Sequence, residues 1–397
     1  MMLSNKIIAL AESETLAMSQ RSTELKNSGI DVINLSVGEP DFFTPDHIKN
    51  AAKTAIDDNF SFYTPVGGYL SLRKAICQKL KNWNNLDFSP EQIVCANGAK
   101  QAICETLMCI LNDGDEVIIP APYWVSYVEM VKIAGGQSAV IQASSANNFK
   151  ITAEQLRAAI TPKTKAFMLC SPSNPTGSIY SKDELKKIAE VLRDFPDVFV
   201  ISDEIYEYIS YVGKVNSLAE YDFLKDRIAI INGVSKGYAM TGWRIGWVAA
   251  PLWLVKGITK LQGQFTSAPS SIAQKAAEKA YSGDNSCVEK MRAAFEKRRD
   301  LIVSLARKIE GFEVNLPDGA FYIFPVCKHY FGKTALNGKT ISNSSDLAMY
   351  LLDTAHVASV GGDAFGSPDC IRFSYATSEE QIVEAFKRIE KALAELK

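Results

Sequence analysis

The alternation of short apolar segments with longer segments of helical spacing constrains this chain most strongly. Apolar runs suited to strands recur between residues 93 and 250, and helical patterns separate several of them. Strands that alternate with helices favour a mostly parallel sheet covered on both faces, with ligands at the carboxyl ends of the strands. The expected strands are 93–96, 116–120, 164–171, 197–206, 227–231 and 245–250, and the expected helices are 100–111, 123–134 and 182–193.

The alternation of strands and helices ends after about residue 284. A long charged helix is expected first, then short strands, a polar exposed loop and a terminal amphipathic helix. These elements are expected at 288–309, 312–315, 320–325, 328–345 and 378–396. The sequence therefore predicts an α/β protein with a large domain over 46–284. A smaller α+β domain is expected from 1–45 and 285–397 together.

The charge balance argues against nucleic-acid and membrane partners. The chain of 397 residues carries 43 Lys and Arg against 45 Asp and Glu, a formal net charge of -2. This balance gives no general attraction for polyanions, and no Lys/Arg-rich run is present. The apolar runs are too short for a membrane span or a signal peptide.

Cysteine and histidine usage argues against a metal centre. None of the eight cysteines forms a CxxC pair, and there are three histidines without an HExxH string. Buried free thiols in a reducing compartment are the expected state of the cysteines. We therefore predict a cytoplasmic protein without a metal site.

Nucleotide-binding motifs are also missing. No GxGxxG fingerprint occurs, which disfavours an NAD-dependent dehydrogenase. The string FGKTALNGKT at 331–340 resembles a P-loop, but five residues separate its two glycines instead of four. No buried strand leads into the first glycine either, so we interpret this string as a surface loop.

Three charged residues lie beside buried strands of the predicted sheet. Lys236 follows the strand at 227–231, where a lysine amine tuned by burial can form a Schiff base with a carbonyl cofactor. Asp203 ends the strand VFVIS, a position suited to a carboxylate opposite a buried cation such as a protonated pyridine nitrogen. Arg244 begins a strand and can bind a phosphate bidentately. Taken singly, each also fits a loop lysine, a turn aspartate or a cation–π arginine.

Three further segments place polar groups at strand ends or in apolar surroundings. The turn SPSNPTG presents Asn174 after a buried strand, and turn chemistry explains its Pro and Gly but not the asparagine. The segment Asn97–Lys100 joins a strand to a helix, so its N–H groups suit either a phosphate or a simple Asn-capped helix start. Arg372 stands in an apolar strand pattern and requires a carboxylate, from a structural acid or from a substrate.

Together these strings resemble the class I/II pyridoxal-phosphate-dependent aminotransferases of fold type I. The ordered motifs are VGEPDF, PYWVSY, SPSNPTG, SDEIY, SKGYAMTGWRIG and IRFSYA, and they span nearly the whole chain. The likeness is strongest to bacterial aspartate aminotransferases of the subgroup that lacks the vertebrate-type distal arginine. The resemblance implies pyridoxal 5'-phosphate (PLP) as cofactor and a fold with a large, mostly parallel-sheet domain and a smaller α+β domain.

The resemblance also implies roles around the cofactor ring. Lys236 would hold PLP covalently and later move a proton between the substrate Cα and the cofactor's C4′. Asp203 would pair with the pyridinium nitrogen and keep it protonated. Tyr206 and Asn174 would bind the cofactor's 3′-oxygen, and Trp124 would stack on the ring.

The cofactor's phosphate would bind at a helix start and at a neighbouring subunit. The resemblance assigns it to the N–H groups of Ala99 and Lys100 and to Arg244. Tyr63 would reach the phosphate of the partner in a homodimer with shared sites. Many relatives carry a phosphate-binding serine three residues before the lysine, where this sequence has Gly233.

A dicarboxylate substrate needs two cations, because burying an unpaired carboxylate is costly. The resemblance implies that Arg372 binds the α-carboxylate, near Asn174, Trp124 and the Gly38 backbone. It also implies that Lys100 and Thr15 meet the distal carboxylate, although Lys100 also fits an ordinary first-turn helix lysine. Some relatives that use prephenate carry a basic residue at the position of Ala11, which favours aspartate here.

The expected activity is therefore amino transfer between L-aspartate and 2-oxoglutarate by a ping-pong PLP mechanism. An aminotransferase with a prephenate, aromatic, alanine or other keto-acid substrate is the nearest alternative. A regulatory protein on the PLP fold is a further alternative. The family-like region begins near residue 10, and no basic recognition helix precedes it.

Overall fold

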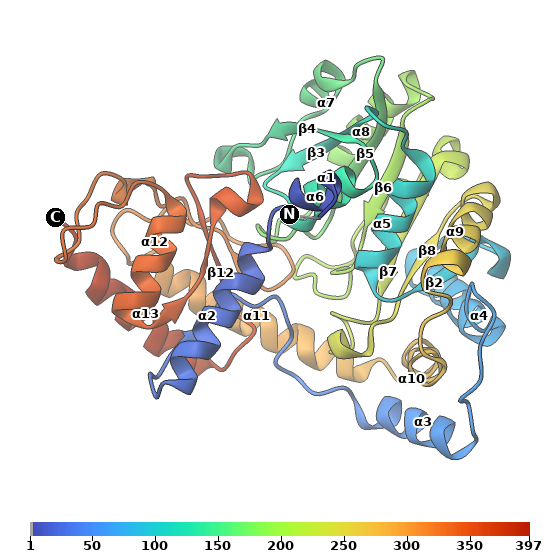
Figure 1. Cartoon of the computed structure of the whole chain (residues 1–397), viewed down its shortest axis with the longest axis horizontal. Helices are drawn as coiled ribbons and strands as arrows, with labels where there is room; N and C mark the ends of the chain where they lie inside the picture. Colours follow the sequence, from blue (N-terminus) through green and yellow to red (C-terminus); the bar gives the residue numbers. More distant parts are fainter. Residues whose placement is uncertain (1–2) are drawn as a thin grey trace.

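A seven-stranded, mostly parallel sheet forms the centre of the larger part of the molecule, in a computed structural model that describes residues 3–397 (Figure 1). Strand β8 runs antiparallel to both of its neighbours, and all other pairs in this sheet are parallel. The spatial order is β2 (Ile93–Ala96), β8 (Gly246–Ala249), β7 (Ile228–Gly233), β6 (Phe199–Asp203), β5 (Thr164–Cys170), β3 (Glu116–Ala121) and β4 (Gln137–Gln142). The predicted α/β class and mostly parallel sheet are confirmed.

Helices cover both faces of this sheet, which explains why its strands are apolar without alternation. Ile93 and Cys95 belong to the core on one face, whereas Val94 and Ala96 belong to the core on the other. The first face packs against α3 (Asp46–Asp57), α4 (Leu70–Lys79), α7 (Ala153–Ala159), α8 (Lys182–Asp194) and α10 (Ser271–Ser282). The second face packs against α5 (Ala99–Ile110), α6 (Ser126–Ile133) and α9 (Leu252–Phe265).

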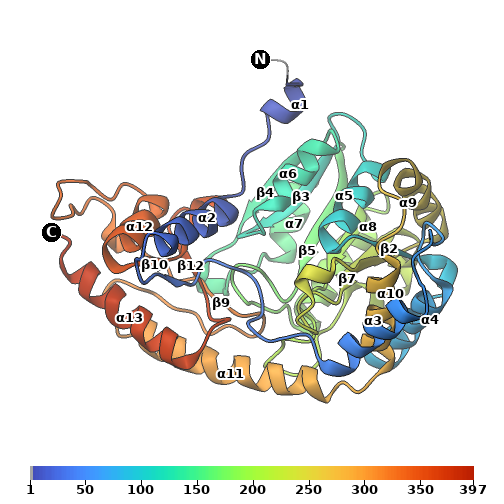
Figure 2. The same ribbon diagram turned by 60° about the horizontal axis from the view of Figure 1, so that its bottom comes forward.

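The smaller part of the molecule has a separate apolar core, built from segments near both chain ends. Its small antiparallel sheet has the order β11-β12-β9, and β1 pairs with β10 in parallel. Helix α11 runs from beside the large sheet to the smaller part, and α1 stands away from that part (Figure 2). The elements are α1 (Asn5–Ile8), α2 (Glu14–Asn27), α11 (Ser286–Ala306), α12 (Ser344–Tyr350), α13 (Glu379–Ala394), β1 (Ile33–Asn34), β9 (Tyr322–Ile323), β10 (Val357–Ala358), β11 (Val360–Gly361) and β12 (Ile371–Ser374).

Most predicted elements lie within a few residues of the observed ones, with four differences. The expected strand at 312–315 is wrong, because only Glu313 makes an isolated bridge there. The apolar residues of that segment instead pack against the core of the smaller part. Helix α6 begins at Ser126, later than predicted, and β6 ends at Asp203, before the predicted end at 206. Strand β4 was not predicted, since its exposed and half-buried positions give it no continuous apolar run.

The string at 331–340, which the sequence predicted to be a surface loop, forms a turn. Thr334 pairs with Thr340 across an isolated antiparallel bridge, so the string does not lead into a helix in the manner of a P-loop. The surrounding segment is less exposed than predicted, because Tyr330 and Ile341 are buried in the core of the smaller part. No helix within residues 3–397 is long and apolar enough to cross a membrane.

A buried ion pair ties α4 to the segment that follows β6. The Lys79 ammonium and the Glu207 carboxylate are in contact, and their side chains are 4% and 2% exposed. Asn84 and Asn232 donate to the two carboxylate oxygens of Glu207 at 2.9 and 2.6 Å. This network fixes the chain between Asp203 at the end of β6 and the start of the loop after β7.

Replacing Lys79 with Met should destabilise the fold strongly. Removal of one partner leaves the Glu207 charge buried without its cation, at a cost of about 3–5 kcal/mol. Urea unfolding of the cofactor-free protein measures this change. The exposed pair of Lys225 and Asp222 provides the matched control, and Lys225→Met should leave the urea midpoint close to that of the wild type. Equal effects of the two substitutions would contradict this role of the buried pair.

Candidate active site

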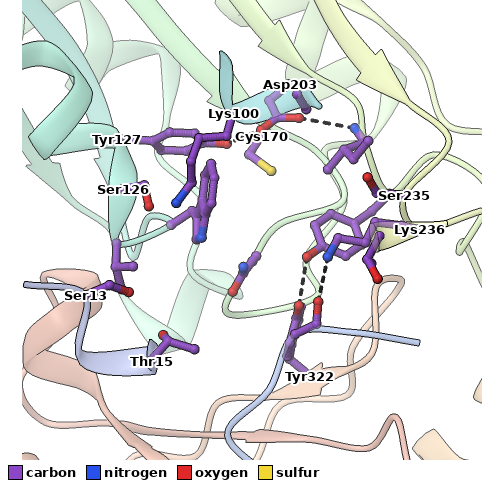
Figure 3. A pocket seen from close by; sticks show the side chains of 18 of the residues that line it. Ser13, Thr15, Lys100, Ser126, Tyr127, Cys170, Asp203, Ser235, Lys236 and Tyr322 are labelled. Atoms are coloured by element: carbon purple, nitrogen blue, oxygen red, sulfur yellow. Dashed lines mark hydrogen bonds between the residues drawn. The ribbon is translucent and has the colours of Figure 1, made fainter. Parts of the chain in front are cut away.

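A cavity of about 290 Å³ lies at the carboxyl ends of the central strands, where the larger and smaller parts of the molecule meet. Of the residues that the sequence predicted for a site, all but Tyr63 line it: Thr15, Gly38, Ala99, Lys100, Trp124, Asn174, Asp203, Tyr206, Lys236, Arg244 and Arg372. Other residues that line the cavity were not predicted from the sequence, among them Ser13, Ser126, Tyr127, Cys170, Ser235 and Tyr322 (Figure 3).

Lys236 presents its amine to the cavity from the loop that follows β7. The amine donates a hydrogen bond to the Gly38 carbonyl oxygen at 2.5 Å. Burial lowers the pKa of Lys236 to about 8, with further lowering by Arg372 and Arg244 and opposition from Glu39. Near neutral pH the amine therefore has an accessible neutral form, which can attack a carbonyl carbon.

Asp203 projects from the end of β6 and is 3% exposed. It accepts hydrogen bonds from the Tyr127 hydroxyl at 2.5 Å and from the Ile205 N–H at 3.2 Å. Burial raises the pKa of Asp203 to about 6, while the Tyr127 and Ile205 bonds and the Lys236 charge act in the opposite direction. Tyr127 therefore favours the ionised form, and a cation placed beside Asp203 would favour it further.

Arg372, on β12, is 1% exposed, and its guanidinium has no carboxylate partner within residues 3–397. It donates to the Asn174 side-chain oxygen at 2.8 Å and to the Ser36 carbonyl at 2.5 Å. Its Nε is buried with no hydrogen-bond acceptor among the described residues. Burial lowers the pKa of Arg372. A buried cation with a free donor suits an anionic ligand, in particular a carboxylate.

Two tyrosines form the wall beside these groups. The Tyr206 and Tyr322 hydroxyls lie 2.7 Å apart, one from the segment after β6 and the other from β9 (Figure 3). The Arg372 guanidinium lies 4.7 Å from the centre of the Tyr322 ring. Tyr322 also explains the glycine at 38, since a Cβ there would lie 2.5 Å from the tyrosine hydroxyl. The chain can approach this wall only with glycine at that position.

The start of α5 and Arg244 form a second cationic region. Gly98 precedes the helix with φ of +84°, and a Cβ on it would collide with the Arg244 guanidinium. Arg244 donates to the Asn97 carbonyl at 3.3 Å and to the Thr241 carbonyl at 2.8 Å. The first N–H groups of α5 and this guanidinium therefore lie close together, which is an arrangement that binds phosphate.

Lys100 and Thr15 reach the cavity from separate parts of the molecule. The Lys100 amine lies 5.0 Å from the centre of the Trp124 ring, and burial together with Arg244 lowers its pKa. Thr15 lies in the first turn of α2, beside Ser13 on the same segment. Figure 3 shows this segment facing Lys100 across the cavity.

Tyr63 is the one predicted site residue that the structure does not bring to this cavity. Its side chain is 100% exposed, in the loop between α3 and α4. The neighbouring Phe62 is 81% exposed, and no intramolecular role is apparent for either ring.

The cavity residues fit PLP on structural grounds. The site offers a buried amine for the aldehyde, a buried carboxylate for the pyridine nitrogen, and a helix start with Arg244 for the phosphate. The Arg372 Nε has no acceptor within residues 3–397, so the guanidinium has a donor available for a substrate carboxylate. Fold and site together therefore define a PLP-dependent enzyme.

Comparison with known proteins gives the family. The model of the family "Aminotransferase class I and II" matches residues 30–389, and this chain belongs to that family. It is 48% identical over 98% of both chains to a probable aspartate/prephenate aminotransferase of Rhizobium leguminosarum bv. phaseoli. It is 45% identical to the aspartate/prephenate aminotransferase of Nitrosomonas europaea, over 99% of this chain and 100% of the other.

Solved structures agree with this assignment. The aspartate aminotransferase of Rhizobium meliloti superposes with a TM-score of 0.96 at 42% identity, over 100% of both chains. The aspartate aminotransferase of Thermus thermophilus with maleate superposes with a TM-score of 0.92 at 36% identity, over 98% of this chain and 99% of the other. The chain is a PLP-dependent aminotransferase with the fold of these enzymes.

The rate of covalent PLP attachment should report the burial of Lys236. Only the neutral amine attacks, so the rate at saturating PLP should rise with pH, reach half its maximum near pH 8 and level off about one to two pH units higher. Stopped-flow absorbance of the cofactor-free protein measures this rate, and borohydride should fix PLP on Lys236. Lys236→Ala serves as the control and should bind PLP only reversibly. A midpoint near the ordinary lysine value of 10.5 would contradict the lowered pKa.

Proposed function

We propose that this chain transfers the amino group of L-aspartate to 2-oxoglutarate, giving oxaloacetate and L-glutamate in a ping-pong reaction. The observation that carries this proposal is a pair of cations on different walls of one cavity. Arg372 comes from β12 in the smaller part, and Lys100 comes from the first turn of α5 in the larger part. Two cations suit the two carboxylates that aspartate and 2-oxoglutarate have in common. The names of the related enzymes, which include aspartate as a substrate, support the same substrate class.

Five residues would act around the cofactor and the substrate α-carbon. PLP supplies an electron sink for the bond that breaks at this carbon. Asp203 would hold the proton at the pyridine nitrogen, and Trp124 would stack on the ring. The Lys236 amine would take the proton from the substrate Cα and return it to the cofactor's C4′. Tyr206 and Asn174 would bind the 3′-oxygen of the cofactor.

The remaining predicted residues would bind and orient charged groups. Ala99 and Lys100 N–H groups with Arg244 would hold the phosphate. Arg372 would bind the substrate α-carboxylate in a site bounded by the Gly38 backbone, Asn174 and Trp124. The Lys100 amine and Thr15 would bind the distal carboxylate, and burial together with the Arg244 charge lowers the pKa of Lys100.

Prephenate is the second candidate substrate, because relatives of 45–48% identity are named for both aspartate and prephenate. Some prephenate-using relatives carry a basic residue at the position that corresponds to Ala11. Ala11 occupies that position, and its N–H donates to the Glu129 carboxylate at 3.0 Å. Glu129 is also paired with Lys132 at 2.9 Å, so the support for aspartate over prephenate rests on the absence of a basic side chain at position 11.

We also propose that two copies of the chain form a homodimer in the cytoplasm. Phe43, Phe62 and Tyr63 are 90%, 81% and 100% exposed, and a second copy would bury such rings. Tyr63 would then reach the phosphate of the partner's site. All eight cysteines are free thiols, which suits a reducing compartment. Sedimentation of the PLP-loaded protein tests the dimer, and a monomeric mass would contradict it.

The proposed domains are a large one at 46–284 and a small one formed by 1–45 and 285–397. The first boundary coincides with the start of α3, and the second falls between α10 and α11. The apolar core of the smaller part is separate from the two cores on the faces of the large sheet, which supports this division.

The Arg372→Lys variant tests the proposed α-carboxylate site. A charged hydrogen bond is worth about 1.5–3 kcal/mol, so loss of the guanidinium fork should lower kcat/KM for aspartate by about two orders of magnitude. A coupled assay with 2-oxoglutarate measures the change. The surface variant Arg193→Lys is the control and should stay near the wild-type value. A loss of less than about threefold for Arg372→Lys would remove it from this role.

Donor comparison in one coupled assay tests the proposed function directly. Aspartate should be the preferred donor over phenylalanine and alanine, and a reverse assay compares prephenate with oxaloacetate. Lys100→Ala should selectively lower kcat/KM for the dicarboxylates, because only these have a distal carboxylate. An equal loss for every donor would remove Lys100 from substrate recognition. Transfer that favours prephenate over oxaloacetate would select the second candidate.

A further inference from the structure

Helices α5 and α9 pack side by side in an antiparallel register that the structure fixes at two points. Near the start of α5, Gln101 donates to the Thr266 hydroxyl at the end of α9 at 2.7 Å. Near the end of α5, the Cys109 sulfur would lie 3.6 Å from a Cβ on Gly257. One turn along each helix from the first contact, Glu105 on α5 therefore faces Gln262 on α9.

This pair of buried side chains leaves two acceptor atoms without partners. Glu105 is 1% exposed and Gln262 is 0% exposed. The Glu105 Oε2 and the Gln262 Oε1 atoms have no hydrogen-bond partner among the described residues. Two unpaired acceptors facing each other away from water are costly, and one proton between them satisfies both.

The neighbouring hydrogen bonds fix the orientation of both amides. Gln262 Nε2 donates to the carbonyls of Val66 and Cys95, both at 2.9 Å, so a flipped amide would set oxygen against oxygen. Gln101 Oε1 accepts from the Asn97 N–H at 2.6 Å, while its Nε2 donates to Glu105 Oε1 at 2.7 Å. The carboxyl group of Glu105 is therefore the one group in this chain of contacts that can carry the missing proton.

We propose that Glu105 is a positioning residue whose protonated carboxyl donates a hydrogen bond to Gln262 and thereby links the phosphate-binding start of α5 to the loop that carries Tyr63. The link runs from the Asn97 N–H through Gln101, Glu105 and Gln262 to the Val66 carbonyl. Burial raises the pKa of Glu105 to about 7, against the effect of the Gln101 bond.

The consequence concerns both ends of one phosphate site, and here the inference rests on the proposed function. Asn97 also accepts from Arg244, so one end of the link lies at the phosphate-binding region of this subunit. Val66 follows Tyr63 by three residues, and Tyr63 would serve the partner's phosphate. A neutral Glu105 therefore holds the two phosphate-binding segments of the dimer in a fixed relation.

Infrared spectroscopy of the holoenzyme tests the proton directly. At about pH 6, below the pKa of about 7, the spectrum should contain a protonated-carboxyl C=O band that Glu105→Gln lacks. Asp203 and Glu204 are also buried acids, so the difference between wild type and Glu105→Gln isolates the Glu105 band. An unchanged spectrum would mean that Glu105 is ionised and would overturn the proposal.

PLP affinity of the full-length variants tests the positioning role. Glu105→Gln retains one acceptor for Gln101 and one donor for Gln262, so its PLP dissociation constant should stay within about twofold of wild type. Glu105→Met removes both, and its dissociation constant should rise by about tenfold. The exposed Glu190→Met is the matched control and should match wild type within about twofold. Absorbance titration of cofactor-free protein, well below the unfolding temperature, measures these constants.

The outcomes separate this proposal from the proposed function. Equal PLP affinity of Glu105→Met and Glu105→Gln would overturn the positioning role while leaving the aminotransferase intact. Failure of the wild-type protein to bind PLP would instead overturn the cofactor site itself. If Glu105→Met does not fold, the infrared comparison still tests the proton. A rise of about tenfold or more in the PLP dissociation constant of Glu105→Gln would then overturn the proposal.

Discussion

Burial of charge at the carboxyl edge of the sheet is the constraint on which the rest of this site depends. Lys236, Asp203 and Arg372 are all removed from water, and each keeps its charge only at a cost. The protein offsets part of this cost with oriented groups such as the Tyr127 hydroxyl and the Gly38 carbonyl. Charged groups of bound molecules would offset the rest of this desolvation cost. The burial of these three charges therefore favours the binding of PLP and of a carboxylate substrate.

The fold supplies this edge through polar support beneath the apolar layers. The end of β6 presents Asp203 to the cavity, and the segment after it presents Tyr206. Further along the same segment, Glu207 joins the buried network with Lys79. Neighbouring Glu204 is buried and accepts from the Ser202 hydroxyl at 2.9 Å. Each residue that faces the cavity is thus followed or preceded by one that anchors the chain. Site geometry and stability therefore depend on the same few peptide units.

Much of the site could be predicted from the sequence, because strand ends can be located from apolar runs. Lys236, Asp203 and Asn174 follow such runs, and parallel strands place them at one edge. Tyr127 and Tyr322 could not be found in this way. Tyr127 lies on the buried face of α6, where its position in the sequence is that of an ordinary core aromatic residue. Tyr322 belongs to a strand of two residues, which is too short to give a recognisable pattern. Their roles arise from contacts between distant segments, which no local pattern records.

Helix α11 gives the molecule a mechanical property that follows from its length alone. Its 21 residues form one continuous helix that begins beside the large sheet and ends in the smaller part (Figure 2). At 1.5 Å per residue this is a rod of about 30 Å. A tilt of about 5° at one end displaces the other by about 3 Å, comparable to the length of a hydrogen bond. Since α11 packs against β9, which pairs with β12, such a tilt would shift the Arg372 guanidinium relative to the large sheet while every helical turn stays intact.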